Sequence, residues 1–239
     1  MKKPPGWQYD EMKPVGVDYA DISEVQAYDE RMGRLRDVKK ECGEIVNTLG
    51  LTPSSTIIEF GAGTGAFAVE AARRCARVIA VDTSAAMIEF ARRRAVKEGA
   101  KNIEFYQAGF LTYEHPGEPV DAAVSQIALH HLPDFWKLIA LKRICRMLKG
   151  GGRLFLRDVV FSFDSDHYQA FFDRWIEGIR TAAGEEMARD TEMSIRDEYY
   201  TCDWVMEGLL ARAGFTIEKA EYTEGFMAVY LCEKKAGQP

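Results

Sequence analysis

The sequence predicts an α/β protein built around a mostly parallel sheet with helices on both faces. Short apolar runs alternate with helical patterns from about residue 56 to residue 158. Repeated strand–helix units of this kind form parallel sheets with right-handed crossovers. Near the end of the chain, two further apolar runs flank the turn at residues 223–225. This arrangement predicts an antiparallel hairpin that completes the sheet.

Length, composition and charge narrow the class of protein. The chain has 239 residues, of which 47% are hydrophobic and 28% are charged, so it can bury a substantial core. The formal net charge of −6 argues against nucleic acid as a partner, because nucleic-acid binders usually carry a basic face. Neither a signal peptide nor an apolar run long enough to span a membrane is present. We therefore expect a cytoplasmic protein without membrane insertion.

The cysteines and acids give no sign of a metal centre. The five cysteines stand singly, without a C-x-x-C pair, so neither a zinc motif nor a redox motif is indicated. Reduced thiols also agree with a cytoplasmic location. No tight acid trio suggests a magnesium site, and we therefore predict no metal.

Residues 1–50 are expected to form an N-terminal arm followed by helices. The arm, up to about residue 21, is rich in Pro, Gly, Tyr and Asp. It could be a disordered terminus, but its aromatic residues also favour an arm that packs over a groove. Over residues 22–49 apolar positions recur at helical spacing, and Gly33 is expected to divide them into two helices.

Residues 51–239 are expected to form the main domain. Its parallel strands and the helices between them follow in strict alternation. The predicted strands are 56–60, 78–82, 103–107, 120–126 and 153–158, and the predicted helices are 65–74, 83–98 and 135–148.

The pattern changes after residue 158. Residues 161–200 are charged and aromatic and predict a helical cover, with one helix at about 167–182, inserted into the main domain. A further helix is expected at 201–213. The closing hairpin is expected at 215–222 and 226–233.

The turn after the first strand indicates the cofactor. Three glycines at alternate positions in 61–65 can take positive φ and let a ligand lie on the backbone, next to the unpaired N–H groups of a helix start. The pattern also fits a dinucleotide fingerprint through Ala66. However, the Glu59 carboxylate would repel a pyrophosphate and attract an ammonium or sulfonium group. This contrast favours S-adenosylmethionine over NAD.

Four motifs in this order resemble class I S-adenosylmethionine-dependent methyltransferases. The glycine turn and Asp82 resemble the first two motifs. Residues 126–134 and 148–154 look like the corresponding regions of the small-molecule branch, and the ubiquinone/menaquinone biosynthesis methyltransferases are similar over the core. The resemblance covers residues 55–160 well. It implies a Rossmann-like seven-stranded sheet in the order 3-2-1-4-5-7-6, with the last strand antiparallel.

The resemblance implies a cofactor site at the carboxyl ends of the strands. Glu59 would face the methionine end of the cofactor, although it could instead pair with a Lys or Arg. Asp82 would accept hydrogen bonds from the ribose, or cap the next helix. Met87 would border the adenine or belong to the core. The predicted cofactor-binding residues are Glu59, Gly61, Ala62, Gly63, Gly65, Asp82, Thr83, Met87, Gly109, Phe110 and Gln126.

Two positions depart from patterns known in related enzymes. Many relatives carry an acid where this chain has Gly109, and that acid contacts the adenine amino group. The contact must here come from the backbone or from another group, while Phe110 could stack near the ring. Gln126 ends the fourth strand within Ser125-Gln126-Ile127-Ala128, where enzymes that methylate planar nitrogen often carry Asn/Asp-Pro-Pro-Tyr. That chemistry is therefore disfavoured.

His130, His131 and Asp158 are the candidate catalytic residues. Either histidine could accept a proton from a hydroxyl or thiol near neutral pH, or the pair could simply cap the turn into the next helix. Asp158 ends the fifth strand. It could orient an acceptor or bind its cation, or it could be another capping residue.

Aromatic residues from the arm and the cover are candidates for the substrate pocket. Tyr9 and Tyr19 would close over the site, as N-terminal segments do in similar enzymes. Tyr168, Phe172 and Trp175 would line an apolar pocket, although their helical spacing is equally typical of packing between cover and sheet.

These features predict S-adenosylmethionine-dependent methyl transfer to a small-molecule acceptor, with S-adenosylhomocysteine as product. The transfer is an in-line displacement, for which the protein supplies alignment and excludes water. The alternatives are an NAD(P)-dependent oxidoreductase and a non-catalytic protein that binds S-adenosylmethionine. The protein is expected to act as a monomer or homodimer.

Overall fold

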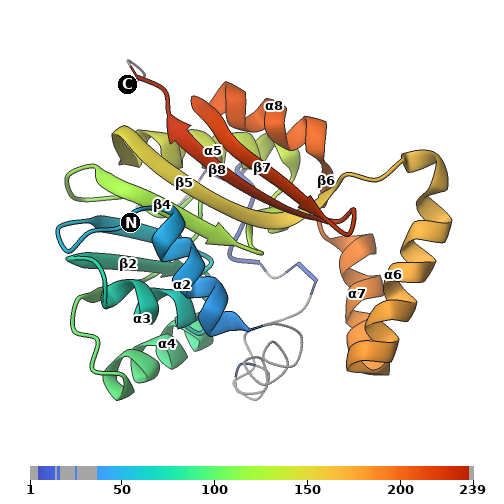
Figure 1. The fold of residues 1–239 in the computed structure, drawn as a ribbon, viewed down its shortest axis with the longest axis horizontal. Coiled ribbons are helices and arrows are strands. Elements are labelled where there is room, and N and C mark those ends of the chain that lie inside the picture. Colours follow the sequence, from blue (N-terminus) through green and yellow to red (C-terminus); the bar gives the residue numbers. More distant parts are fainter. Residues whose placement is uncertain (1–4, 14, 17–24, 26–36, 237–239) are drawn as a thin grey trace.

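The computed structural model describes residues 5–13, 15–16, 25 and 37–236. Its strands form one mixed sheet (Figure 1). The strands are β1 (Thr56–Phe60), β2 (Arg77–Asp82), β3 (Ile103–Gln107), β4 (Val120–Gln126), β5 (Leu148–Phe161), β6 (Thr201–Cys202), β7 (Phe215–Thr223) and β8 (Met227–Lys234).

The strand order is β3-β2-β1-β4-β5-β8-β7. β8 runs antiparallel to both of its neighbours, β5 and β7, and the pairs among β1 to β5 are parallel. With the two-residue β6 left aside, this is the predicted order 3-2-1-4-5-7-6, and the predicted fold class is confirmed. The prediction of seven strands was one short, because β6 pairs with the end of β5.

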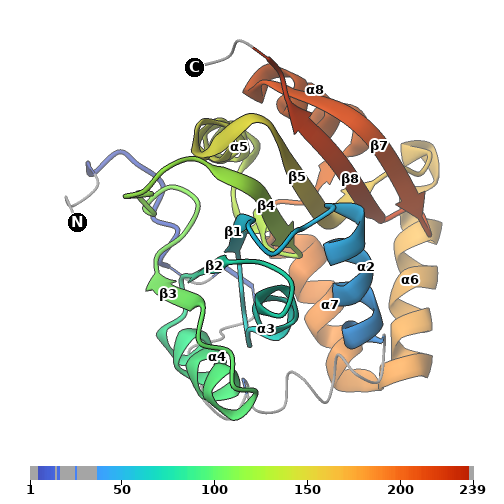
Figure 2. The ribbon, with the colours of Figure 1, turned by 60° about the vertical axis from the view of Figure 1, so that its left-hand side comes forward.

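Helices cover both faces of the sheet (Figure 2). One face is covered by α2 (Val38–Thr48), α3 (Ala66–Ala72) and α4 (Ala85–Lys97), and the other by α5 (Asp134–Met147) and α8 (Asp203–Ala213). Each face has its own apolar core. On β1, Ile57 belongs to the core beneath α2 and α3, whereas Ile58 belongs to the core beneath α5 and α8. This alternation along one strand follows from the two-residue period of β structure.

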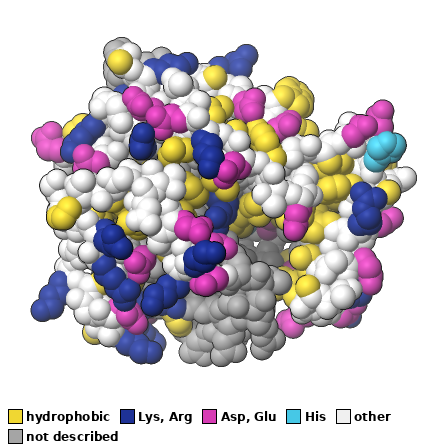
Figure 3. Space-filling model, in the orientation of Figure 1, with side chains coloured by type: hydrophobic (Ala, Val, Ile, Leu, Met, Phe, Trp, Pro, Cys, Tyr) yellow, Lys and Arg dark blue, Asp and Glu magenta, His cyan; other side chains and the backbone are white. Residues whose placement is uncertain are grey.

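The helical cover consists of two helices, α6 (Tyr168–Ala183) and α7 (Glu185–Asp197), that stand beside the sheet (Figure 1). Hydrophobic side chains gather on the side of this pair that faces the sheet (Figure 3). Trp175 of α6 stacks on Phe226 with ring centroids 4.2 Å apart, and Phe163 stacks on Phe171 at 3.8 Å. Aromatic contacts therefore attach the cover to the end of β5 and the closing hairpin.

Several element boundaries differ from the sequence prediction. β5 begins at Leu148, because Leu148 pairs with Val120 before the register shifts and the ladder resumes at Arg153. The strand therefore includes the glycines at 150–152. The helix expected from residue 201 begins at Asp203, since the two residues before it form β6. The first of the two helices expected over 22–49 lies almost entirely outside the described residues.

Candidate active site

A cavity of about 700 Å³ lies at the carboxyl ends of β1 to β4. This is the edge where open α/β sheets bind ligands. Segments that follow four strands meet there, and the arm and α7 complete the wall. The lining residues are Tyr9, Glu11, Met12, Lys13, Val15, Gly61, Gly63, Asp82, Thr83, Ser84, Ala85, Ala86, Met87, Gln107, Ala108, Gly109, Phe110, Gln126, Ile127, Ala128, His130, His131, Leu132, Met187, Asp190, Thr191, Ser194, Glu198 and Tyr200.

The glycine turn leaves room for a ligand on its backbone. Gly63 has φ +51°, and no other atom lies within 4 Å of the place where its Cβ would be. Gly65 begins α3 at φ +76°, where an added Cβ would come within 2.8 Å of Ala91 Cβ. Gly63 therefore opens the cavity floor, while Gly65 permits close helix packing. Of the predicted cofactor-binding residues, Glu59, Ala62 and Gly65 are not among the lining residues.

Asp82 connects the ends of β1 and β2. Its Oδ2 accepts a hydrogen bond from Gly63 N at 2.8 Å, and its Oδ1 accepts one from Ser84 N at 2.8 Å. Burial raises the pKa of Asp82, whereas these two hydrogen bonds act to lower it. A carboxylate oxygen can accept more than one hydrogen bond, so Asp82 retains acceptor capacity toward the cavity. Ser84, not Asp82, is the N-cap of α4.

Glu59 is the strongest indication that the site holds a positively charged ligand. Glu59 is 3% exposed. Within the described part of the chain, its Oε2 is buried and has no hydrogen-bond partner. Burial and the neighbouring Asp82 charge raise the pKa of Glu59 well above its usual value. No Lys or Arg of the described chain pairs with it in an ion pair, which leaves the predicted alternative without support. The carboxyl accepts a backbone hydrogen bond from Ala68, but its second oxygen has no partner. A buried acid with an unused oxygen fits the ammonium or sulfonium of S-adenosylmethionine.

The N-terminal arm supplies an acid at Gly109. The Glu11 carboxylate accepts hydrogen bonds from Leu111 N at 2.9 Å and from Thr112 N at 2.7 Å. It occupies the space that a side chain at Gly109 would need, so an added Cβ there would collide with it. A carboxylate therefore does lie beside Gly109, and it belongs to Glu11, which also lines the cavity.

Tyr9 attaches the same arm to the opposite wall of the cavity. Its hydroxyl donates to His131 O at 3.1 Å, and its ring meets Tyr199 edge-on at 6.1 Å. Tyr9 therefore lines the cavity as the sequence predicted. Tyr19, the other predicted arm residue, lies outside the described residues.

The chain enters the acceptor end of the cavity through a strained residue. Ile127 follows β4 with φ +50°, a rare conformation for a β-branched side chain. Its N–H donates to Arg157 O at 2.8 Å, which holds the turn in place. Such strain is typical of functional sites. It directs the chain from Gln126 into the turn that carries the two histidines.

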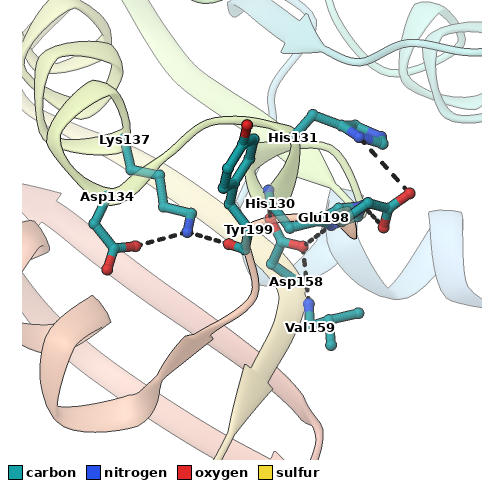
Figure 4. A network of polar contacts seen from close by, with 8 residues as sticks. All are labelled: His130, His131, Asp134, Lys137, Asp158, Val159, Glu198 and Tyr199. Carbon is teal, nitrogen blue, oxygen red and sulfur yellow. Dashed lines mark hydrogen bonds and ion pairs between the residues drawn. The ribbon is translucent and has the colours of Figure 1, made fainter. Parts of the chain in front are cut away.

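His130 lies in a buried polar network rather than in the cavity alone (Figure 4). Its Nδ1 is 2.5 Å from Asp158 Oδ1, and its backbone N–H donates to Asp158 Oδ2 at 3.1 Å. Asp158 is fully buried, lies within β5 and also accepts from Val159 N. It does not line the cavity. Asp158 therefore orients His130, and the structure does not support its predicted contact with an acceptor.

Glu198, at the end of α7, faces both histidines. Its Oε2 is 3.3 Å from His130 Nε2, and its Oε1 is 4.0 Å from His131 Nδ1. Burial lowers the pKa of His130, but the Asp158 and Glu198 charges outweigh it and the pKa is raised. Burial raises the pKa of Glu198, and the His130 charge opposes this. Sequence reasoning missed both Glu198 and Glu11, since each lies far along the chain from the segment it contacts.

The predicted aromatic pocket residues lie elsewhere. Phe172 and Trp175 belong to the ring contacts between α6 and Phe161 at the end of β5, and Tyr168 is 52% exposed. None of the three is among the residues that line the cavity. Phe172 and Trp175 instead pack between the cover and the sheet, which was the alternative interpretation of their helical spacing. Met187, Thr191 and Ser194 of α7 form the wall instead.

Comparisons with known proteins agree with this geometry. Residues 57–152 match the family model described as a methyltransferase domain. An uncharacterised methyltransferase from Geobacillus kaustophilus is 30% identical over 197 residues, which cover 82% of this chain and 84% of the relative. Fold and site together define a methyltransferase of the Rossmann-like type. The chain belongs to the class I S-adenosylmethionine-dependent methyltransferases.

Solved structures share the fold at low sequence identity. A methyltransferase from Aquifex aeolicus, named as S-adenosylmethionine-dependent, superposes with a TM-score of 0.62 at 17% identity, covering 89% of this chain and 98% of that protein. The cyclopropane synthase MmaA2 from Mycobacterium tuberculosis gives 0.61 at 16% identity, covering 80% and 83%. These proteins are named for different reactions, so the acceptor must be argued from the site.

No helix within the described residues is long and apolar enough to cross a membrane.

Proposed function

We propose that this protein transfers the methyl group of S-adenosylmethionine to a small-molecule acceptor. The observation that supports this proposal is one cavity with two chemically different ends. One end offers glycine backbone and Asp82, and Glu59, two residues before Gly61, is a buried acid whose Oε2 has no partner in the described chain. The other end offers His131, Glu198 and the polar side of α7. A volume of about 700 Å³ is in the range of small-molecule sites.

The cofactor end would hold S-adenosylmethionine through local features of the first three strands. Glu59 would attract the positive charge of the methionine end, and Asp82 would accept hydrogen bonds from the ribose hydroxyls. Gly63 would let the ligand lie against the backbone. Thr83, Met87 and Phe110 line the neighbouring wall and would border the adenine.

The acceptor would lie between Gln126 and α7. Methyl transfer from a sulfonium is an in-line displacement at carbon, and S-adenosylmethionine supplies the activated methyl group. The protein then contributes alignment and a dry site. The arm and α7 would exclude water, because Tyr9 and Glu198 close the cavity on opposite sides of His131. The predicted catalytic roles of His130 and His131 stay predictions.

Calorimetric titration of the full chain with S-adenosylmethionine and S-adenosylhomocysteine tests this proposal. Both ligands are expected to bind at one equivalent per chain, and Asp82→Ala is expected to abolish or strongly weaken both titrations. The exposed variant Glu89→Ala is the matched control, since Glu89 pairs with Arg93 on the outer face of α4. Failure of both ligands to bind the wild-type chain would refute the assignment.

An NAD(P)-dependent oxidoreductase is the second candidate. Only the glycine turn favours an oxidoreductase. The pyrophosphate of NAD(P) would lie near the buried Glu59, whose carboxylate would repel it. Thermal unfolding with NAD(P) present distinguishes the candidates, because a ligand that binds the folded state raises the melting temperature. A clear rise with NAD(P) and none with S-adenosylmethionine would favour this candidate. A protein that binds S-adenosylmethionine but yields no S-adenosylhomocysteine with any acceptor would be non-catalytic.

A further inference from the structure

The acceptor end contains a set of metal-ligand atoms that the sequence does not reveal. Ligand atoms of His130, His131 and Glu198 all lie within 4.8 Å of one another. The shortest separation, 3.3 Å between His130 Nε2 and Glu198 Oε2, is close to the roughly 3.3 Å that separates neighbouring ligands around a tetrahedral zinc ion. Figure 4 shows the two histidines and Glu198 on adjoining segments.

Asp158 fixes the orientation that a metal-binding histidine needs. Its carboxylate holds His130 Nδ1 at 2.5 Å and receives two backbone N–H groups, from His130 and Val159. A hydrogen bond at Nδ1 leaves the Nε2 lone pair directed at Glu198. Histidine ligands in metal sites are generally held in this way by a carboxylate at the other ring nitrogen.

The contact between His130 and Glu198 requires a positive charge. When Nδ1–H donates to Asp158, Nε2 and the Glu198 carboxylate are both acceptors, and they face each other at 3.3 Å. Two buried acceptors at this distance repel unless a cation lies between them. That cation is either a metal ion or a proton, carried by His130 or by Glu198. His131, whose side chain is 35% exposed, lies on the cavity side as a third ligand.

The surrounding contacts hold Glu198 in this position. Tyr199 N donates to His130 O at 3.0 Å. The fully buried Lys137 donates to Tyr199 O and, at 2.7 Å, to Asp134 Oδ1. Tyr199, the residue after Glu198, is therefore attached to the histidine turn through its N–H and to α5 through its carbonyl. Ligands that are ordered before the metal arrives bind it more favourably than flexible ligands do.

We propose that His130, His131 and Glu198 bind one divalent transition-metal ion of the zinc type at the acceptor end of the cavity. Two imidazoles and one carboxylate suit such an ion and leave coordination positions open. These positions would face the space proposed above for the acceptor. The ion would then hold an acceptor oxygen or sulfur. This last step rests on the proposed function, whereas metal binding itself does not.

Equilibrium dialysis of metal-stripped full-length protein against Zn²⁺, followed by elemental analysis, tests the site. One equivalent per chain is expected for the wild type, and a Co²⁺-loaded sample should show the visible absorption of a site with mixed nitrogen and oxygen ligands. Glu198→Gln and His131→Gln should each weaken Zn²⁺ binding at least tenfold. Asp158→Asn should weaken it about 10- to 100-fold through His130.

His167→Gln is the matched control, because His167 is 78% exposed and lies far from the cavity lining. It should bind Zn²⁺ as the wild type does. If Glu198→Gln unfolds, the partly exposed His131 still provides the test. Absence of stoichiometric Zn²⁺, or unchanged affinity in His131→Gln, would overturn the proposal and leave a proton between His130 and Glu198. Loss of S-adenosylmethionine binding alone would refute the proposed function and not the metal site.

Discussion

Replacing Glu59 with glutamine tests the feature that distinguishes this cofactor site from a dinucleotide site. The change keeps the shape of the side chain and removes its charge. Glu59 is 3% exposed and has a buried oxygen without a partner in the described chain. A hydrogen bond to a charged group contributes about 1.5–3 kcal/mol. Glu59→Gln should therefore weaken S-adenosylmethionine binding by roughly 10- to 150-fold.

The pH dependence gives a second readout. Burial and the Asp82 charge raise the pKa of Glu59, so between its unfolded and folded pKa the cofactor-free protein holds the carboxyl protonated. Binding of a cationic ligand favours the charged form and must release that proton. Wild-type affinity should therefore rise with pH through the raised pKa. Glu59→Gln should lack this rise in affinity with pH when it is compared with the wild type at each pH.

The same shift predicts the effect on stability. An acid whose folded pKa is raised stabilises the fold fully below its unfolded pKa, and this contribution is lost as pH rises through the folded value. Cofactor-free Glu59→Gln should therefore be at least as stable as the wild type at and above neutral pH. Calorimetric titration and thermal unfolding, from about pH 5 to about pH 8, measure both effects.

Glu89→Gln makes the same change on an exposed side chain and should alter neither affinity nor stability. Equal affinity of Glu59→Gln and wild type at every pH would show that Glu59 does not face the cation of the cofactor.

Three further predictions concern other described contacts. Asp82→Asn should weaken S-adenosylmethionine and S-adenosylhomocysteine binding about tenfold, because a neutral amide replaces a charged acceptor; equal titrations would contradict a ribose contact. Gly109→Ala should displace the Glu11 carboxylate and destabilise the fold by about 1–3 kcal/mol, measured by urea unfolding. Its cost should shrink in the Glu11→Ala background, and strict additivity would rule out the contact. Lys137→Met should lower stability by about 1–3 kcal/mol, since Tyr199 O loses its buried donor; an unchanged melting temperature would refute this.

The sheet could be predicted from the sequence because its signals are local. Each parallel strand is a short apolar run, and Asp82 and Gln126 mark strand ends that periodicity alone locates. The cofactor end shares this advantage, since the glycine turn and Asp82 belong to neighbouring strand ends. The start of β5 was missed because residues 150–152 are glycines, which are typical of turns. Here the pairing of Leu148 with Val120 outweighs that local preference.

The cavity walls formed by the arm and α7 could not be predicted, because distant segments form them. Neither Glu11 nor Glu198 stands in a pattern that indicates a site, and each acquires its role through one long-range contact. Glu11 binds Leu111 and Thr112, and Glu198 meets the histidine turn. The prediction that aromatic residues of the cover line the substrate pocket also depended on a long-range contact that the sequence does not show. Their helical spacing indicates an apolar face but not whether that face meets a ligand or the sheet.

This difference between the two ends bears on how the protein selects its acceptor. The sheet and its glycine turn hold the residues proposed to bind the methyl donor, and they are ordered by two apolar cores. The end proposed for the acceptor depends on α7, whose buried residue is Ala188. The arm also reaches the end proposed for the methyl donor, because Glu11 fills the space beside Gly109. Changes in α7 can therefore alter the proposed acceptor site while the proposed donor site persists, whereas changes at Glu11 also affect the donor end.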